Sequence, residues 1–367
     1  MGDIKNEIKK FYYCVAHIYP YFNYGKCGKT CYLIISKGRL HCSCSYRGYE
    51  ALDFVDSHQR QTTRFNEFLF QLCDRMTVMD AASLMKIDWK HAYHTDRQGL
   101  EQLKASVPLP KMSFIGVDEI AFERHHRYFT IVYDLVDDNG TLYVGKDRTS
   151  ESLSAFFVSL TQAQRDSIQA VSMDMWDPYI RSVRRYLPHA DIVFDRFHLK
   201  KHLNRCLDNL RRAIVRHAPS TEKRFVKGKR WVLLKNENNH TTKDKKALEQ
   251  LKQINSPLYE AYLIKEQFDR FFTLSNKTEA KRFLKTWFEQ IPETIRPYFR
   301  IFYNMLNRYL YGVLTYFTYH ITNAVAEGLN NKIKVLKRMA YGYRDQAYFQ
   351  LKILRKCGYL KQASPVF

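Results

Sequence analysis

The sequence predicts an α/β protein built around a mixed five-stranded sheet. Two observations in residues 112–198 predict it: five short β-rich runs occur there, and helical patterns separate the last three of them. Strands that follow one another closely favour a meander, whereas strands separated by a helix favour parallel crossover units. The order strand-strand-strand-helix-strand-helix-strand therefore predicts one sheet with both kinds of pairing.

Turn and capping residues mark the limits of these elements. The run Asp137-Asp138-Asn139-Gly140 is a strong hairpin signal between the second and third strands. Ser150 is expected to cap the first helix, and Pro178 suits the first turn of the second. The expected strands are Met112–Val117, Tyr128–Leu135, Thr141–Gly145, Ile168–Met173 and Asp191–Phe194, and the second helix is expected at Pro178–Tyr186.

The charge of the chain indicates a polyanionic partner. Its 367 residues include 59 Lys and Arg against 37 Asp and Glu, which gives a net charge of +22. Nucleic acid is the first candidate and an anionic membrane the second. No apolar run is long enough to span a bilayer, and the N-terminus lacks the apolar core of a signal peptide. We therefore expect a cytoplasmic protein that associates with DNA and not with a membrane.

Two carboxylates, Asp118 and Asp174, each follow a buried strand in this scheme. Residues at the strand ends of an open α/β sheet project into a common crevice, where two carboxylates repel unless a cation lies between them. Mg²⁺ or Mn²⁺ fits such oxygen ligands. A lone Asp after a strand is more often a turn or capping residue, so either position alone carries little weight.

Glu327 is the candidate for a third ligand. It lies in Ile321–Met339, a helical pattern whose expected buried stripe is Val325, Leu329, Ile333 and Leu336. Glu327, Asn330, Asn331 and Lys334 are expected on another face, acidic at its start and basic at its end. Three carboxylates could hold two metal ions that cleave a phosphodiester. By itself, however, a helical Glu is usually a solvated side chain.

Five blocks of the sequence, in order along residues 113–345, resemble the Asp-Asp-Glu transposases of the ISL-three insertion-sequence family. They are GVDEIAFERHHRYFTIVYD, VSMDMWDPYI, IVFDRFHLKKHLN, RWVLLKN and ITNAVAEGLNNKIKVLKRMAYGYRD. The resemblance implies a ribonuclease H-like core with Asp118, Asp174 and Glu327 as the catalytic triad. It also implies a transposase that binds the terminal inverted repeats of an insertion sequence and uses two divalent ions for DNA cleavage and strand transfer.

The spacing of the triad predicts an insertion. Asp118 and Asp174 are 56 residues apart, but Glu327 follows Asp174 by 153 residues, far more than a compact core needs. Residues 112–198 are therefore interpreted as the first part of the core, residues 199–320 as an inserted helical domain, and residues 321–367 as the helix with Glu327 and a tail. Basic runs in the insertion, such as Arg211-Arg212, suggest DNA contact.

Asp195 and His198 form an Asp-x-x-His pair that resembles a further family motif. The pair could bind metal or support the neighbouring ligands, and a plain structural role for His198 at a helix start is equally open. We expect Asp195 and His198, with Asn330 and Asn331, beside the site rather than on the metal. Glu119 and Asp177 are nearby acids that we expect to cap helices or pair with bases.

The cysteines of residues 1–57 could bind a structural Zn²⁺. Cys27, Cys31, Cys42 and Cys44 follow the pattern C-x3-C-x10-C-x-C, in which the second pair is unusually close. Unliganded thiols are the alternative, since the family commonly carries knuckles closer to C-x-x-C.

Residues 58–105 are predicted to hold a helix-turn-helix. Its first helix is expected at Thr77–Met85 and its recognition helix at Trp89–Leu100, with an ordinary helical hairpin as the alternative. The residues expected to contact DNA are Lys90, His94 and Arg97, followed on the helix after Glu327 by Lys332, Lys334, Lys337 and Arg338.

The predicted function is that of a DNA transposase, active as a homodimer or higher oligomer because two DNA ends must be joined. Two alternatives stay open: a sequence-specific DNA-binding protein without enzymatic activity, and a ribonuclease H-like nuclease that acts on branched DNA.

Overall fold

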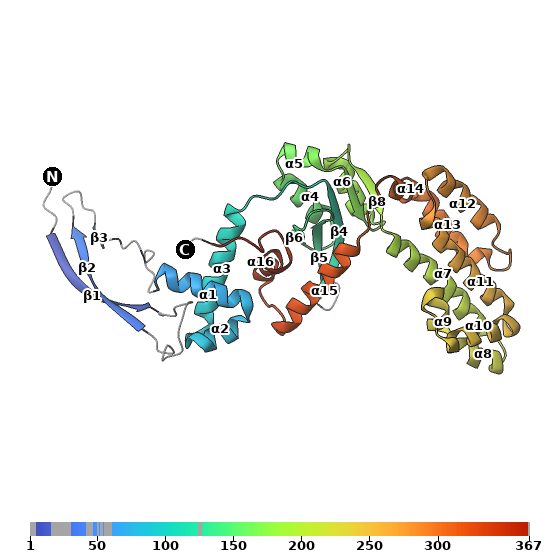
Figure 1. Cartoon of the computed structure of the whole chain (residues 1–367), viewed down its shortest axis with the longest axis horizontal. Helices are drawn as coiled ribbons and strands as arrows, with labels where there is room; N and C mark the ends of the chain where they lie inside the picture. Colours follow the sequence, from blue (N-terminus) through green and yellow to red (C-terminus); the bar gives the residue numbers. More distant parts are fainter. Residues whose placement is uncertain are drawn as a thin grey trace. The chain divides into compact units, whose positions relative to one another are not determined.

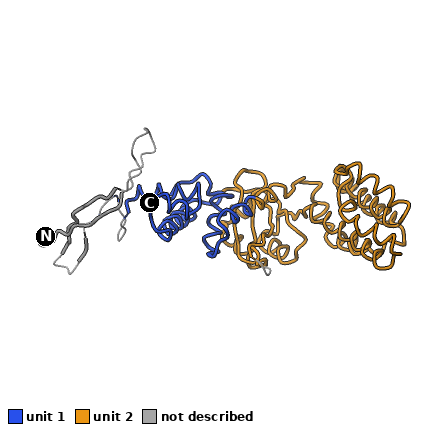
Figure 2. The backbone as a smooth tube through the Cα atoms, turned by 90° about the horizontal axis from the view of Figure 1, so that it is seen from below, with its two compact units in different colours: residues 1–109, 332–367 blue, residues 110–331 orange. Residues whose placement is uncertain are grey.

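The computed structural model describes residues 5–15, 31–41 and 47–49 by their backbone alone, and residues 51, 54, 61–123 and 127–365 in more detail. The chain divides into two compact units, which Figure 2 shows in different colours. One unit combines residues 1–109 with 332–367, and the other comprises residues 110–331. No helix in the described part of the chain is long and apolar enough to cross a membrane.

The second unit contains the predicted mixed sheet, with strands in the order β6-β5-β4-β7-β8. β4 pairs antiparallel with β5, and β5 with β6, whereas β4, β7 and β8 are parallel neighbours. The meander and crossovers predicted from the sequence are confirmed. The strands are β4 (Phe114–Glu123), β5 (Arg127–Asp134), β6 (Thr141–Lys146), β7 (Ala170–Met173) and β8 (Asp191–Phe194).

Two local predictions were wrong. Asp118 does not follow its strand but lies inside β4, because antiparallel pairing with β5 continues to Glu123. The first helix after the meander is capped by Thr149, whose side chain accepts a hydrogen bond from the N–H of Ser152, and not by Ser150. Ser150 is instead the first residue of that helix.

Helices complete the layers around the sheet (Figure 1). α4 (Ser150–Ser159) packs against α6 (Asp177–Tyr186) and β6, and α5 (Gln162–Ser167) is a short helix that the sequence did not indicate. α14 (Leu310–Tyr319) packs on β8. This contact requires Gly312, because a Cβ there would meet the ring of Phe194 at 2.6 Å.

Residues 196–319 are helical, as predicted, and they are packed around aromatic side chains. Phe268, Phe271, Trp287 and Phe302 are all at most 2% exposed, and edge-to-face contacts link several of their rings. The helices are α7 (Arg196–His217), α8 (Ser220–Lys227), α9 (Arg230–Leu234), η1 (Glu237–Asn239), α10 (Thr242–Ile254), α11 (Ser256–Gln267), η2 (Phe268–Thr273), α12 (Lys277–Glu289), α13 (Arg296–Arg308) and α14.

The first unit contains the predicted pair of helices with a tight turn. α2 (Val78–Met85) ends at Lys86, which adopts the left-handed conformation with φ 53°, and Asp88 caps the next helix. That helix, α3 (Trp89–Ser106), continues six residues beyond the predicted end at Leu100. α1 (Thr63–Arg75) completes the bundle through Phe65 and Leu69, which pack with Ala81 and Ala92.

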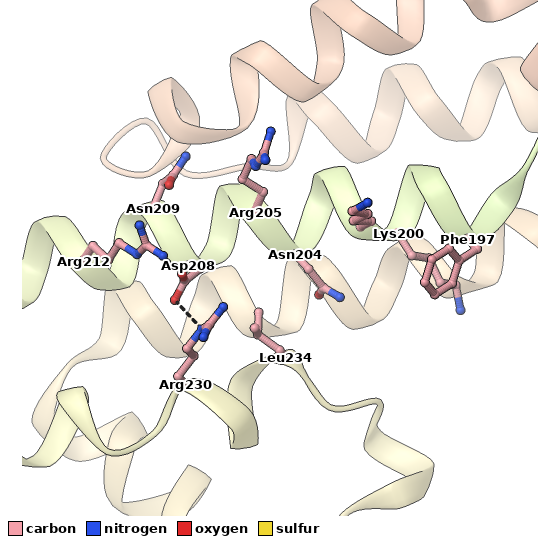
Figure 3. Close-up of a pocket in the computed structure, with 10 residues that line it drawn as sticks. Phe197, Lys200, Asn204, Arg205, Asp208, Asn209, Arg212, Arg230 and Leu234 are labelled. Atoms are coloured by element: carbon pink, nitrogen blue, oxygen red, sulfur yellow. Dashed lines mark ion pairs between the residues drawn. The ribbon is translucent and has the colours of Figure 1, made fainter. Parts of the chain in front are cut away.

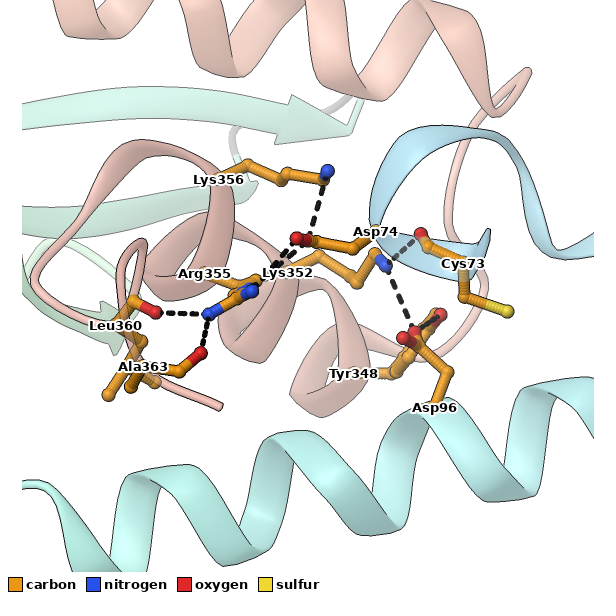
Figure 4. A network of polar contacts seen from close by, with 9 residues as sticks. All are labelled: Cys73, Asp74, Asp96, Tyr348, Lys352, Arg355, Lys356, Leu360 and Ala363. Atoms are coloured by element: carbon orange, nitrogen blue, oxygen red, sulfur yellow. Dashed lines mark hydrogen bonds and ion pairs between the residues drawn. The ribbon is translucent and has the colours of Figure 1, made fainter. Parts of the chain in front are cut away.

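The C-terminal helix α16 (Gln346–Cys357) belongs to this same unit and packs against α3. Figure 4 shows how Lys352 of α16 reaches Asp96 of α3, while Arg355 binds Asp74 of α1. In residues 5–15, 31–41 and 47–49 the backbone forms an antiparallel sheet of β1 (Lys5–Val15), β2 (Cys31–His41) and β3 (Arg47–Tyr49).

Candidate active site

Three aspartates occupy equivalent positions on the three parallel strands. β4 and β7 are in register through Gly116 and Ser172, so Asp118 and Asp174 each lie two residues further along. The register of β7 with β8 then places Asp195 level with Asp174. Neighbouring parallel strands in register direct equivalent side chains to the same side of the sheet. The sheet therefore brings together residues that are 56 and 21 positions apart in the sequence.

Backbone N–H groups that follow each aspartate fix one of its carboxylate oxygens. Asp195 caps α7 in this way, which also places its negative charge at the positive end of a 22-residue helix. The donors to Asp118, Asp174 and Asp195 are the N–H groups of Glu119 (2.8 Å), Met175 (2.6 Å) and Phe197 (3.2 Å).

The carboxylates suit a divalent cation. Burial raises the pKa of Asp118 and of Asp195 above the ordinary range, and the neighbouring carboxylates oppose their ionisation further. A bound Mg²⁺ or Mn²⁺ would remove this penalty, since hard oxygen ligands are what these ions prefer. The donor set of Asp118 and Asp174 thus fits the metal that the sequence implied.

His198 contacts Asp174 directly. Its Nδ1 atom lies 3.2 Å from Asp174 Oδ2, and His198 belongs to the first turn of α7. Burial by itself lowers the pKa of His198, but the ion pair with Asp174 outweighs burial and raises it. The same contact lowers the pKa of Asp174 although burial acts to raise it. The Asp-x-x-His sequence therefore supplies one carboxylate in the row and one imidazole that orients its neighbour.

Asn330 connects the helix of Glu327 to the sheet. That helix, α15, spans Ala324–Met339, and Asn330 Nδ2 donates to Asp118 Oδ2 at 2.7 Å. The hydroxyl of Tyr133 in β5 donates to Asn330 Oδ1. Both polar atoms of the Asn330 amide are thus used, one of them to orient Asp118.

The predicted buried stripe of α15 was partly wrong. Val325 is 46% exposed, whereas Asn330 is only 8% exposed and occupies the face that was predicted to be apolar. The physical reason is that the hydrogen bonds to Asp118 and Tyr133 satisfy the amide, so that burying it carries no penalty.

Glu327 lies on the exposed side of α15, one turn before Asn330. Its backbone N–H donates to the carbonyl of Asn323, and Asn323 Oδ1 would lie 3.2 Å from a Cβ at Gly116 of β4. The residues one turn on either side of Glu327 therefore contact β4, at Gly116 and Asp118. Within the described ranges, no three His, Cys, Asp or Glu side chains are grouped closely enough to hold a metal ion.

Arg148 is part of the site, and sequence reasoning missed it. Its guanidinium lies 3.0 Å from Glu119 and 3.9 Å from Asp174, and it stacks over the ring of Trp176 at 4.2 Å. Burial raises the pKa of Glu119 to about 7, although Arg148 opposes this rise. No motif marks Arg148, because it comes from the loop after β6, far from either aspartate in the sequence.

The acids expected to pair with bases do so. Glu119 pairs with Arg148, and Asp177, the first residue of α6, lies 2.8 Å from the guanidinium of Arg308. Both acids therefore have a basic partner, as the sequence predicted.

Comparison with known proteins shows the family of the chain. A family model described as a transposase matches residues 115–353, which include all three aspartates and Glu327. A second model, the helix-turn-helix domain of transposase family ISL3, matches residues 50–91. The chain belongs to the transposase family ISL3.

Curated relatives of this ISL3 transposase agree. The chain is 32% identical over 328 residues to the transposase for insertion sequence element IS1001 of Bordetella parapertussis, a match that covers 88% of this chain and 80% of that protein. It is 26% identical over 347 residues to the transposase for insertion sequence element IS1557 of Mycobacterium tuberculosis, covering 88% of this chain and 78% of that one.

Most of the residues expected to contact DNA are exposed, but one is bound within the protein. Lys90 and His94 are exposed on α3 of the transposase, as a groove-reading role requires. Arg97 is instead bound within the protein, 2.7 Å from Asp345 and 2.9 Å from Glu101. On α15, Lys332, Lys334 and Arg338 are exposed and Lys337 is half-buried, while Asn331 is exposed and makes no described contact with the aspartates.

The predicted zinc ligands of the transposase lie outside the described residues. This applies to Cys27, Cys42 and Cys44, and for Cys31 only the backbone position at the start of β2 is described. Zinc binding therefore stays a prediction from the sequence.

Proposed function

We propose that this ISL3 transposase cleaves DNA at the ends of an insertion sequence and joins the freed ends to a target, with a ribonuclease H-like core and two divalent ions. The supporting observation is the row of Asp118 and Asp174 on adjacent parallel strands. Burial and the neighbouring carboxylate raise the pKa of Asp118 although His198 lies nearby, and a bound cation would remove this penalty. Asp118, Asp174 and Glu327 would hold the ions.

When bound, the two ions would activate a water or a 3′-hydroxyl and stabilise the leaving oxygen. The chain's own residues position the ligands. Asn330 fixes one oxygen of Asp118, and His198 fixes one oxygen of Asp174. Each aspartate keeps its other oxygen on a backbone N–H, so neither carboxylate is free to rotate. Such positioning is what in-line phosphoryl transfer asks of the protein.

Glu327 would complete the site by a change of side-chain rotamer. Residues three apart on a helix have Cβ atoms about 5–6 Å apart, so Glu327 is close to Asn330, whose amide holds Asp118. Its exposure means that no packing opposes the movement. Binding of DNA and metal would supply the free energy for this rotamer change, since a third carboxylate ligand neutralises more of the charge of the two metal ions.

The helix-turn-helix of α2 and α3 would recognise the terminal inverted repeats. Lys90 and His94 lie in the first two turns of α3, where a recognition helix contacts base edges and phosphates. Joining two ends requires two such readers, so the active form would be at least a homodimer. The protein would act on DNA in the cytoplasm.

The test uses the purified full chain and linear DNA that carries its own element ends, with Mg²⁺ or Mn²⁺, followed by mapping of nicks at nucleotide resolution. We expect nicks at the element ends with wild type and none with Asp174→Asn. End binding by Asp174→Asn should be unchanged, because Asp174 and α3 belong to different compact units. End binding without cleavage by wild type would favour the non-enzymatic alternative, and cleavage of branched DNA irrespective of sequence would favour the nuclease.

A further inference from the structure

α7 carries a polar stripe that is separate from its buried face. Its side chains recur at intervals of three and four residues, the spacing of one helix face. The buried face is apolar and includes Leu199, Leu203 and Leu207. The stripe lines a groove of about 560 Å³ between α7 and α9, with the cations Lys200, Lys201, Arg205, Arg212 and Arg230 (Figure 3).

Asp208 organises the far end of this groove. Its carboxylate is almost fully buried and lies 2.8 Å from Arg211, 2.9 Å from Arg212 and 3.5 Å from Arg230. Figure 3 shows Arg230 extending from α9 to meet Asp208 on α7. One carboxylate cannot neutralise three guanidinium groups, so the end of the groove keeps an excess of positive charge in a fixed arrangement.

The middle of the groove holds cations with no acidic partner. Lys201 and Arg205 are exposed, and neither forms an ion pair within residues 127–365. Lys200 does have a partner, Asp269 at 2.8 Å, so it contributes less net charge. Exposed, unpaired cations along one helix face fit a polyanion whose charges are regularly spaced.

Two exposed aromatic side chains lie beside these cations. Phe197, at the start of the groove, is 59% exposed, and Trp231, next to Arg230, is 71% exposed. The guanidinium of Arg230 lies 4.8 Å from the Trp231 ring centroid. Exposed aromatic side chains beside cations are typical of surfaces on which the bases of a nucleic acid strand stack.

The first residue that lines the groove, Phe197, is the neighbour of an active-site residue in the chain. His198, which contacts Asp174, and Phe197 are neighbours on the first turn of α7. At about 1.5 Å per residue, Arg212 lies roughly 21 Å along the helix from His198. A DNA strand rises about 3.4 Å per nucleotide along the duplex axis, so the groove has room for about six nucleotides.

We propose that the groove along α7 binds the backbone of the DNA strand that leads away from the scissile phosphate, over about six nucleotides. The inference rests on the proposed function in one respect, the position of the scissile phosphate. The binding of DNA in the groove does not depend on it. Lys201, Arg205 and Arg212 contact phosphates, and Asp208 positions Arg212 and Arg230. The strand belongs either to the element or to the flanking DNA, and both have the same backbone chemistry.

The test compares two triple variants in the full chain with Asp174→Asn, which prevents cleavage. The groove variant is Lys201→Ala, Arg205→Ala and Arg212→Ala. The matched control is Lys281→Ala, Arg282→Ala and Lys285→Ala, which removes three exposed cations from α12. The affinity for end DNA is measured by fluorescence anisotropy between 50 and 300 mM KCl. One DNA ends at the cleavage site. The others are extended by ten nucleotides on the element side, on the flanking side or on both.

For the groove variant we expect the slope of log affinity against log salt to fall by about 2–3 on one class of extended DNA, as three lost phosphate contacts predict. It should not change on DNA truncated on that same side. For the control variant, the slope of log affinity against log salt should change equally on truncated and on extended DNA. The extended side that responds identifies the strand as element or flank.

Equal loss on truncated and extended DNA, or a groove variant that behaves as the control does, would overturn the proposal. A photo-crosslinking residue in place of Asn209, an exposed groove residue, gives a second readout. Its cross-links should fall within about ten nucleotides of the cleavage site, and cross-links elsewhere would also contradict the inference. Cleavage by the wild-type protein is assayed separately and tests the proposed function. A failure of the groove proposal can therefore be distinguished from a failure of the proposed function.

Discussion

Replacing Lys352 by Met is expected to destabilise the unit that carries the helix-turn-helix. Lys352 Nζ lies 3.0 Å from Asp96 Oδ2 and donates to the carbonyl of Cys73 at 2.9 Å. The side chains of Lys352 and Asp96 are only 5% and 1% exposed. Tyr348 also donates to the same oxygen of Asp96. The substitution would leave a buried carboxylate with one neutral donor.

The burial of this pair sets the magnitude. Removing one partner of a buried ion pair costs about 3–5 kcal/mol, because the other charge stays buried without compensation. Lys356 is the matched control: it also binds a carboxylate, Asp74 at 3.0 Å, but both side chains are more than 20% exposed. Pairs nearer the surface contribute about 0–1 kcal/mol, so Lys356→Met should have little effect.

Hydrogen exchange of the full chain measures the difference locally. Amides of α3 and α16 should exchange roughly 10²–10⁴ times faster in Lys352→Met, since about 1.4 kcal/mol corresponds to a factor of ten. The double variant Asp96→Asn with Lys352→Met should recover most of the loss, because it removes both charges and keeps an acceptor for Tyr348. Equal exchange rates in Lys352→Met and Lys356→Met, or a double variant less stable than the single one, would contradict a stabilising buried ion pair.

Three further outcomes are expected. Asn330→Ala should reduce cleavage about 10- to 100-fold and leave end binding unchanged, because it frees one oxygen of Asp118; unchanged cleavage rates would contradict this. Chelation by EDTA should abolish cleavage and spare end binding, as a gel-shift and nicking assay on one sample can check. Burial acts to raise the pKa of Asp74, but hydrogen bonds from Arg355 and Lys356 lower it overall. Its stabilising contribution should be full above about pH 4 and lost as the pH falls below its folded value. Asp74→Asn should therefore flatten the loss of stability between pH 5 and 2.5 in denaturant titrations, and an unaltered acid transition would exclude that role.

The order of the strands could be predicted because each strand is a local pattern. The apolar runs, the Asp137–Gly140 turn and the helical spacing between runs act over a few residues, and the sheet has the predicted meander and crossovers. Asp118 and Asp174 could be singled out because both follow from where buried strands fall. The prediction failed in detail at Asp118, since how far β4 continues depends on its partner β5 and not on its own residues.

The contacts that complete the site could not be predicted, because they join residues far apart in the chain. Asn330 and Asp118 are separated by 212 positions, and only the packing of α15 on β4 reveals that a polar residue fills the buried face. Arg148 carries no motif, and its role comes from where the loop after β6 passes Glu119 and Asp174.

The sequence by itself therefore determined the composition of the sheet, the positions of the acidic residues and the family, all of which depend on local patterns and residue identity. The tertiary structure decided which side chains orient those acids, which helix of the C-terminus joins the helix-turn-helix unit, and where the cations of α7 form a groove. These depend on the burial of charged and polar groups, and burial is a property of packing between distant segments, which no local pattern encodes.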